Sequence, residues 1–289
     1  MAPRRALPWL LVPPLLWIGG LLVVPQLRML ELSFRRKLPL AQLGGPEDVY
    51  TAENYLRFAE NPLYWKVFVK TVLSAVVITA VAFLIAFPIA YFLAKVARGR
   101  WATRLFLAIV VPFWVNEIVR TFAWLLILTE QGVLNQMLVA LGFVQTPVSY
   151  LYTEGAVILG MAYAYMLFML FPLYASLENL DFSLVEAAQD LGAGWTRVLR
   201  HIILPHCVPG AVAGSIMVFM LAVGTYVVPA MLGGKGAIWF VQLIYARFYD
   251  ALNWNLGSAF AFSLLVLSLG FVAGMLRLFR LSMGRVLQT

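Results

Sequence analysis

Charged residues are scarce in this chain. Asp, Glu, Lys and Arg make up 12% of its 289 residues, whereas hydrophobic residues make up 63%. A soluble domain is typically about 25% charged and about 45–50% apolar. An aqueous fold could not bury this much apolar surface, so we predict that the chain folds mostly in lipid. Its net charge of +8 then indicates cationic residues at the cytoplasmic membrane face rather than nucleic-acid binding.

Cysteine and histidine are almost absent. Cys207 is the single cysteine, and His201 and His206 are the two histidines. One cysteine excludes a disulfide framework within the chain, and the three residues together are too few for most metal sites. We therefore expect no bound metal and no cofactor in this chain.

Long uncharged stretches dominate the sequence instead. A helix needs about 20 mostly apolar residues to cross a bilayer, and prolines are tolerated in such helices. A stretch at 132–153 is also uncharged, but Asn135, Gln145 and Pro147 favour a short surface helix with a loop. We therefore predict six spans rather than seven, at residues 7–30, 67–94, 104–128, 154–177, 207–232 and 258–280.

The distribution of Lys and Arg predicts the orientation. The first span follows two arginines like a signal sequence, but it is long and has no small-residue cleavage site, so we interpret it as a retained anchor. Arg35, Arg36 and Lys37 would lie outside, against the positive-inside rule. All other clusters favour two cytoplasmic termini, and the basic residues then inside are Arg4, Arg5, Lys95, Arg98, Arg100, Arg104, Arg197, Arg200, Arg277, Arg280 and Arg285.

The segment between the fourth and fifth spans predicts a helix–turn–helix. Ser183 followed by Glu186 is a capping box, which marks a helix start. Gly192 and Gly194 interrupt that helix and permit a turn with positive φ. A second helix then ends before Pro205.

Apolar residues recur along this segment at steps of three and four, which predicts one apolar stripe on the cytoplasmic side. Such a stripe needs a groove in a partner protein. The residues of the predicted stripe are Leu184, Ala188, Leu191, Trp195, Val198 and Ile202.

The same segment resembles the EAA signature of ABC importer permeases: Glu-Ala-Ala, three residues, Gly, nine residues, Ile, one residue, Leu-Pro. The resemblance implies a six-helix, all-α integral membrane fold of the type I (MetI-like) kind, with residues 1–66 as anchor and first periplasmic loop and 67–289 as permease core. It implies that the loop at 178–206 docks on an ATPase. The matching positions are Glu186, Ala187, Ala188, Gly192, Ile202, Leu204 and Pro205.

Other stretches are similar to the B-type permeases of spermidine/putrescine importers. The resemblance therefore implies a polyamine as solute, with an opine, an amino-acid-like compound, a phosphonate or iron as alternatives. The similar stretches are 32–34, 53–55, 112–114, 120–124, 132–135 and 225–234.

The resemblance also implies the partners and the energy source. They are a second homologous permease subunit, two ATPase subunits and a periplasmic binding protein, all acting at the bacterial inner membrane. This chain has no G-x-x-x-x-G-K-[ST] phosphate loop, so ATP and Mg²⁺ would be used by the ATPase. The glycine-rich residues 233–236 lack that spacing and are interpreted as a turn.

Two charges in the third span are candidates for the solute pathway, because charge inside a membrane is costly. Glu117 and Arg120 lie one helical turn apart. They could pair with each other, or Glu117 could face the pathway and receive an ammonium group. Trp114, Trp124 and Tyr226 could add cation–π contacts, or could belong to packing or an interfacial belt.

Asp250 is a further candidate, just before the sixth span. With Asn253 and Asn255 it could form an acidic outer vestibule, and the alternative is a solvated loop. Two other function classes are a gradient-driven secondary transporter, which would not need the EAA loop, and an intramembrane enzyme. The sequence has no H-E-x-x-H motif and no paired catalytic carboxylates, so it favours a non-catalytic permease.

Overall fold

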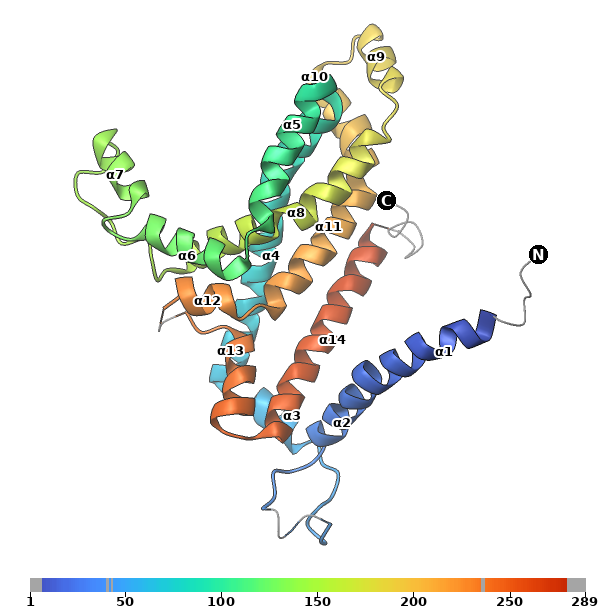
Figure 1. Ribbon diagram of the computed structural model, residues 1–289, viewed down its shortest axis with the longest axis vertical. Helices are drawn as coiled ribbons and strands as arrows, with labels where there is room; N and C mark the ends of the chain where they lie inside the picture. Colours follow the sequence, from blue (N-terminus) through green and yellow to red (C-terminus); the bar gives the residue numbers. More distant parts are fainter. Residues whose placement is uncertain (1–6, 40–41, 43, 235–236, 280–289) are drawn as a thin grey trace. The chain divides into compact units, whose positions relative to one another are not determined.

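The computed structural model describes residues 7–39, 42, 44–234 and 237–279, and every regular element within them is a helix (Figure 1). The chain divides into two compact units. The first contains residues 1–66 and 242–267, and the second contains residues 67–241 and 268–289. This division into compact units does not test the predicted division into an anchor with its loop (1–66) and a permease core (67–289), which stays a prediction.

The first unit begins with a continuous helix, in which a π-helical turn at Gly19–Val23 joins α1 to α2. It also contains the first residues of α4 and most of α14. Its helices are α1 (Leu7–Ile18), α2 (Val24–Ser33) and α3 (Glu53–Glu60), the end of α13 (Phe240–Tyr245), a π-helical turn (Ala246–Asp250) and the start of α14 (Trp254–Leu278).

The second unit contains the remaining helices. Its π-helical turns lie at Phe92–Val96 and Leu199–Ile203, and a 3-10 turn lies at Val111–Trp114. The helices are α4 (Pro62–Tyr91), α5 (Gly99–Val110), α6 (Glu117–Leu128), α7 (Val133–Ala140), α8 (Glu154–Glu178), α9 (Ser183–Asp190), α10 (Trp195–Val198), α11 (Leu204–Gly224) and α12 (Val227–Leu232).

Six helical stretches among the described residues are long and apolar enough to cross a membrane, which confirms the predicted number. The orientation stays a prediction, since Arg4, Arg5, Arg280 and Arg285 lie outside the described residues. Lys235 and Gly236, which belong to the predicted turn at 233–236, also lie outside them. The six stretches are Val12–Ser33, Pro62–Val96, Glu117–Ala140, Glu154–Glu178, Trp195–Gly224 and Trp254–Leu278.

The predicted third span, 104–128, is wrong as a single helix. The chain leaves helical geometry at Val115, whose ψ is 138°, and at Asn116, whose ψ is 141°. Pro112 lies just before this break, where it lacks an N–H for the helical ladder. α5 and α6 consequently run in different directions (Figure 1). As predicted for 132–153, one short helix, α7, is followed by a loop.

The predicted fifth span, 207–232, is also corrected. Helical structure begins twelve residues earlier, at Trp195, and ends at Gly224. The second helix of the loop was predicted to end before Pro205, but the chain continues through this proline. A π-helical turn at Leu199–Ile203 ends two residues before it, so the helical hydrogen-bond pattern is already irregular where Pro205 cannot donate.

α8 and α11 form the most extensive helix pair of the second unit. A Cβ on Gly210 would overlap the backbone carbonyl of Pro172 and the hydroxyl of Ser176. A Cβ on Gly214 would overlap the sulfur of Met169. The two backbones therefore approach closely because these positions carry no side chain, as expected for small residues between membrane helices.

The basic cluster after the first span has nearby acidic partners. Arg35 forms ion pairs with Glu31, at 2.8 Å, and with Asp48, at 3.0 Å. Arg36 pairs with Glu53. These ion pairs give the basic cluster acidic partners, but the positive-inside rule counts Lys and Arg alone, so the segment remains an exception to it.

Candidate functional site

The loop between α8 and α11, which we call the coupling loop (residues 178–206), extends beyond the ends of both helices (Figure 1). Lys95, in the π-helical turn after α4, anchors its beginning. The Lys95 Nζ donates to the backbone oxygens of Glu178, at 3.3 Å, and Leu180, at 2.7 Å. The first carbonyl belongs to the last turn of α8 and the second follows it, and a cation is favoured there by the helix dipole.

α9 begins at Ser183, as predicted, but the predicted capping box is wrong. Ser183 is the first helical residue and makes no side-chain cap. Asp181 takes that role, because its Oδ1 accepts a hydrogen bond from the Ser183 N–H at 3.0 Å. This bond lowers the pKa of Asp181, and the nearby charge of Lys95 adds to the effect.

The end of α9 is a Schellman turn. The Gly192 N–H donates to the Gln189 oxygen at 2.8 Å, and the Ala193 N–H donates to the Ala188 oxygen at 2.9 Å. Gly192 has a φ of +80°, which confirms the predicted left-handed residue. Gly194 is extended, with a φ of −68°, and directly precedes α10.

The predicted apolar stripe is divided between two faces. Val198 is buried together with Val185, each with about 1% exposure. Leu191 is 89% exposed, and Leu184 and Trp195 are about half exposed. Glu186 and Ala187 are also exposed. The coupling loop therefore has its own small core and presents a separate apolar surface.

The candidate pathway residues lie where the α5–α6 segment breaks. Asn116 caps α6, since its Oδ1 accepts from the Ile118 N–H at 2.8 Å. Glu117 follows as the first residue of α6, a position at which the helix dipole favours negative charge. The Tyr165 hydroxyl, from the middle of α8, donates to Glu117 Oε1 at 3.0 Å.

Arg120 and Glu117 lie one turn apart, yet the described structure contains no ion pair between them. The Arg120 guanidinium lies over the ring of Phe113, with 4.9 Å between the guanidinium carbon and the ring centroid. Its Nε and Nη1 atoms are buried, and neither has a hydrogen-bond partner within the described residues. Glu117 and Arg120 therefore do not form an ion pair, and both charged groups can interact with other partners.

Aromatic rings from α6 and α8 continue from Phe113, the ring that lies under Arg120. Tyr163 contacts Phe113, with 5.2 Å between centroids, and Trp124, with 5.5 Å. A second helix break lies between α11 and α12, at residues 225–226, and Thr225 there lies near the Tyr165 hydroxyl. We call this group the helix-break cluster: Phe113, Glu117, Arg120, Trp124, Tyr163, Tyr165 and Thr225.

The other sequence candidates are placed differently. Trp114 is 82% exposed, and Tyr226 is 39% exposed at the second helix break. Asp250 belongs to the first unit, where it is exposed at the end of a π-helical turn. The neighbouring asparagines have structural partners: Asn253 Oδ1 accepts from the Leu256 N–H, and Asn255 Nδ2 donates to the Leu32 oxygen. The roles of Trp114, Tyr226 and Asp250 stay predictions.

Sequence reasoning missed Tyr163, Tyr165 and Thr225. They come from α8 and from the end of α11, far from Glu117 along the chain. No local spacing connects them, and a tyrosine in an apolar helix is ordinary. Only the fold brings them to the charged pair.

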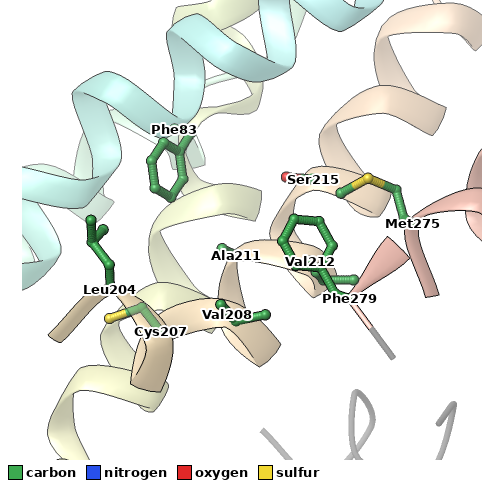
Figure 2. Close-up of a pocket in the computed structure, with 9 residues that line it drawn as sticks. All are labelled: Phe83, Leu204, Cys207, Val208, Ala211, Val212, Ser215, Met275 and Phe279. Atoms are coloured by element: carbon green, nitrogen blue, oxygen red, sulfur yellow. The ribbon is translucent and has the colours of Figure 1, made fainter. Parts of the chain in front are cut away.

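A cavity of about 290 Å³ in the second unit is almost wholly apolar (Figure 2). Ser215 is its one hydroxyl and Cys207 its one thiol, and no charged side chain lines it. It therefore does not suit a charged solute. The described residues also contain no group of three or more His, Cys, Asp or Glu side chains that could hold a metal.

A known family accounts for this architecture. Residues 86–279 match the family described as "Binding-protein-dependent transport system inner membrane component", and the chain belongs to this family. It is a non-catalytic, multi-pass permease subunit of an ABC importer in the bacterial inner membrane. This confirms the fold class, the location and the absence of enzymatic activity predicted from the sequence. An importer of this family includes an ATPase and a periplasmic binding protein.

Particular relatives are polyamine permeases. The chain is 33% identical over 250 residues to the spermidine/putrescine transport system permease protein PotB of Escherichia coli (strain K12), which covers 86% of this chain and 89% of PotB. It is 34% identical over 251 residues to PotB of Haemophilus influenzae (strain ATCC 51907 / DSM 11121 / KW20 / Rd), covering 87% and 86%.

A solved structure shares the fold. It is the crystal structure of a bacterial ABC transporter involved in the import of the acidic polysaccharide alginate. The match covers 96% of each chain with a TM-score of 0.72 and 17% sequence identity.

Proposed function

We propose that this subunit forms part of the path by which a polyamine of the spermidine/putrescine class crosses the inner membrane. The single observation that carries this is the Glu117 carboxylate. It lies at a helix break, receives the Tyr165 hydroxyl and is not neutralised by Arg120. A charge in a membrane span costs roughly 2.5–3.5 kcal/mol at the centre, so an unneutralised carboxylate there suits a cationic solute.

The surrounding rings support the same solute class. Tyr163 contacts both Trp124 and Phe113, and Phe113 carries the Arg120 guanidinium; aromatic faces attract ammonium groups. A broken helix also leaves backbone groups free to face a pathway, which is a recurrent feature of transporter sites. The similarity to PotB over most of the chain supports this assignment.

The coupling loop connects this path to its energy source. Its exposed Leu184, Leu191 and Trp195 suit a groove on an ATPase subunit. ATP and Mg²⁺ are used by that partner, whose two copies close and reopen and so switch the path between outward and inward access. A second, homologous permease completes the path, and a periplasmic binding protein delivers the solute. This chain itself binds no cofactor.

Arg120 favours a second candidate, a solute with both charges. Its Nε and Nη1 have no hydrogen-bond partner within the described residues and lie one helical turn from Glu117. A compound with an ammonium and an acidic group, such as an opine, an amino-acid-like solute or an aminophosphonate, would engage both side chains.

The test is uptake by the assembled importer in proteoliposomes. Glu117→Gln removes the charge with little change of shape, and we expect spermidine uptake to fall roughly tenfold, as for a lost hydrogen bond to a charged group. Glu130→Gln, at an exposed loop position, is the matched control and should transport normally. Full spermidine uptake by Glu117→Gln would remove Glu117 from the path.

The two solute classes are separated by Arg120→Gln. For a polyamine, this variant retains uptake, because no acidic group needs the guanidinium. For a zwitterion such as an aminophosphonate, uptake by Arg120→Gln should fall as much as uptake by Glu117→Gln. The second candidate would replace the first if the native importer takes up no spermidine and if Arg120→Gln loses the uptake of the aminophosphonate.

A further inference from the structure

One short segment, formed by the last residue of α4 and the π-helical turn after it, contacts the coupling loop at two places. At the first place, the start of the loop, Lys95 Nζ donates to the oxygens of Glu178 and Leu180. These residues are more than 80 positions away in sequence, so the contact links two different helices. The bonded carbonyls belong to the last turn of α8 and to the residues that lead into α9.

At the second place, the start of α10, Tyr91 packs against Trp195. The two rings meet edge to face, with 5.6 Å between their centroids. Trp195 is the first residue of α10, where the chain turns back toward α11. Tyr91 and Lys95 lie four residues apart, at the end of α4 and in the π-helical turn after it, so this segment reaches both the start of the loop and the start of α10.

The loop between these contacts is a compact piece. α9 packs against α10, Val185 and Val198 are buried, and Leu180 is 4% exposed. A force applied to its exposed surface therefore moves the piece as a whole. The segment at Tyr91 and Lys95 contacts this piece before α9 and at the start of α10, so the force reaches α4 as well as α8 and α11.

We infer that Tyr91 and Lys95 form a clamp that passes movement of the coupling loop into α4. They are positioning residues for transport, because they act through the loop rather than on the solute. The inference rests on the proposed docking of the ATPase on this loop. A simpler role for Lys95, that of satisfying the last carbonyls of α8, predicts a loss of stability but no change in the amount of solute moved per ATP.

The experiment measures solute uptake and ATP hydrolysis together in proteoliposomes that contain the whole importer. Lys95→Met keeps the length of the side chain but removes the donor. We expect the solute moved per ATP to fall roughly fivefold, a typical size for one coupling between sites. Lys95→Arg keeps a donor and should restore most of this ratio. The matched control is Arg98→Met, which removes one exposed charge at the same end of α4.

Tyr91 is tested in the same assay. Tyr91→Leu removes the ring that meets Trp195 and should lower the ratio, whereas Tyr91→Phe retains the ring and should keep it. An unchanged ratio for both Lys95→Met and Tyr91→Leu, with normal ATPase association, overturns the clamp. If the native importer itself retains no ATPase, the proposed function fails, and the clamp fails with it.

Chemical rescue keeps the test valid where Lys95→Met assembles poorly. In a Cys207→Ala background, Lys95→Cys is assembled and then treated with aminoethyl methanethiosulfonate, which attaches a side chain ending in an ammonium. The ratio should rise toward the native value. Methyl methanethiosulfonate, which attaches a neutral group, should not raise it. Equal ratios after both reagents overturn the inference, because folding and assembly are the same in the two samples.

Discussion

The coupling loop and the helix-break cluster differ in how they are assembled. The loop comes from one continuous stretch of sequence, and its turn and cap are made by neighbours along the chain. The cluster combines side chains from α6, α8 and the end of α11, together with Phe113 from the turn before the break. A local structure tolerates change in its surroundings, whereas the cluster depends on how closely its helices pack.

A pair of glycines gives the largest expected contrast between the two regions. Gly210→Ala places a Cβ against the backbone of α8, and overpacking of this kind costs typically 1–3 kcal/mol and occasionally more. We expect a large loss of folded protein in detergent. Gly192→Ala has open space around it and has only its left-handed backbone to accommodate, at about 1–2 kcal/mol. Thermal unfolding of both variants checks the order, and a milder effect at Gly210 would contradict the close packing of α8 and α11.

An exposed residue of the coupling loop should affect binding without affecting folding. Leu191 is 89% exposed, and complete burial of a leucine side chain against a partner stabilises by about 1.5–3 kcal/mol. Leu191→Ser should therefore reduce copurification of the ATPase at least about tenfold with the melting temperature unchanged. Exposed Leu141, outside the loop, supplies the control Leu141→Ser. Normal ATPase recovery with Leu191→Ser would show that the surface is not the docking site.

Arg120 provides the opposite case within the cluster. Its buried Nε and Nη1 have no partners within the described residues, and an unsatisfied buried donor costs about 1–3 kcal/mol. Arg120→Met, which can still cover the Phe113 ring, should therefore leave the free energy of unfolding unchanged or raise it. Chemical unfolding in detergent measures this. A loss of more than about 2 kcal/mol would show that the guanidinium supports the fold.

The smallest effect expected is a pH dependence at the start of α9. Hydrogen bonding lowers the pKa of Asp181 in the folded chain, so its stabilising contribution is present above the unfolded pKa. It is lost as the pH falls below about 4. Hydrogen exchange of the α9 amides, corrected for intrinsic rates, should rise in acid for the native chain but not for Asp181→Asn, which keeps a neutral acceptor. Identical pH profiles would assign the cap to another group.

Much of the fold follows from sequence, because its signals are local. Apolar length predicts the number of spans, and Gly192 predicts its own left-handed turn. The corrected details depend on competing neighbours. Asp181 precedes Ser183 and takes its capping role, and a π-helical turn carries the chain through Pro205.

The candidate site is less predictable. The charge of Glu117 is visible in the sequence, but its separation from Arg120 depends on two competitors, the Tyr165 hydroxyl and the Phe113 ring. Helical spacing alone favours an ion pair between residues three apart. Spacing carries no information about side chains that arrive from other helices, so neither the separation nor the hydrogen bond to Tyr165 could be derived from it.

Because Gly210 and Gly214 carry no side chains, α11 packs closely against α8 at both positions. At Gly210 the next atoms are the backbone of Pro172, so the two helices have little room to slide past each other there. α8 carries Tyr165 near its middle, and α11 continues without interruption from the coupling loop. We therefore expect a tilt of α11 to carry α8 with it, and with α8 the tyrosine that contacts Glu117.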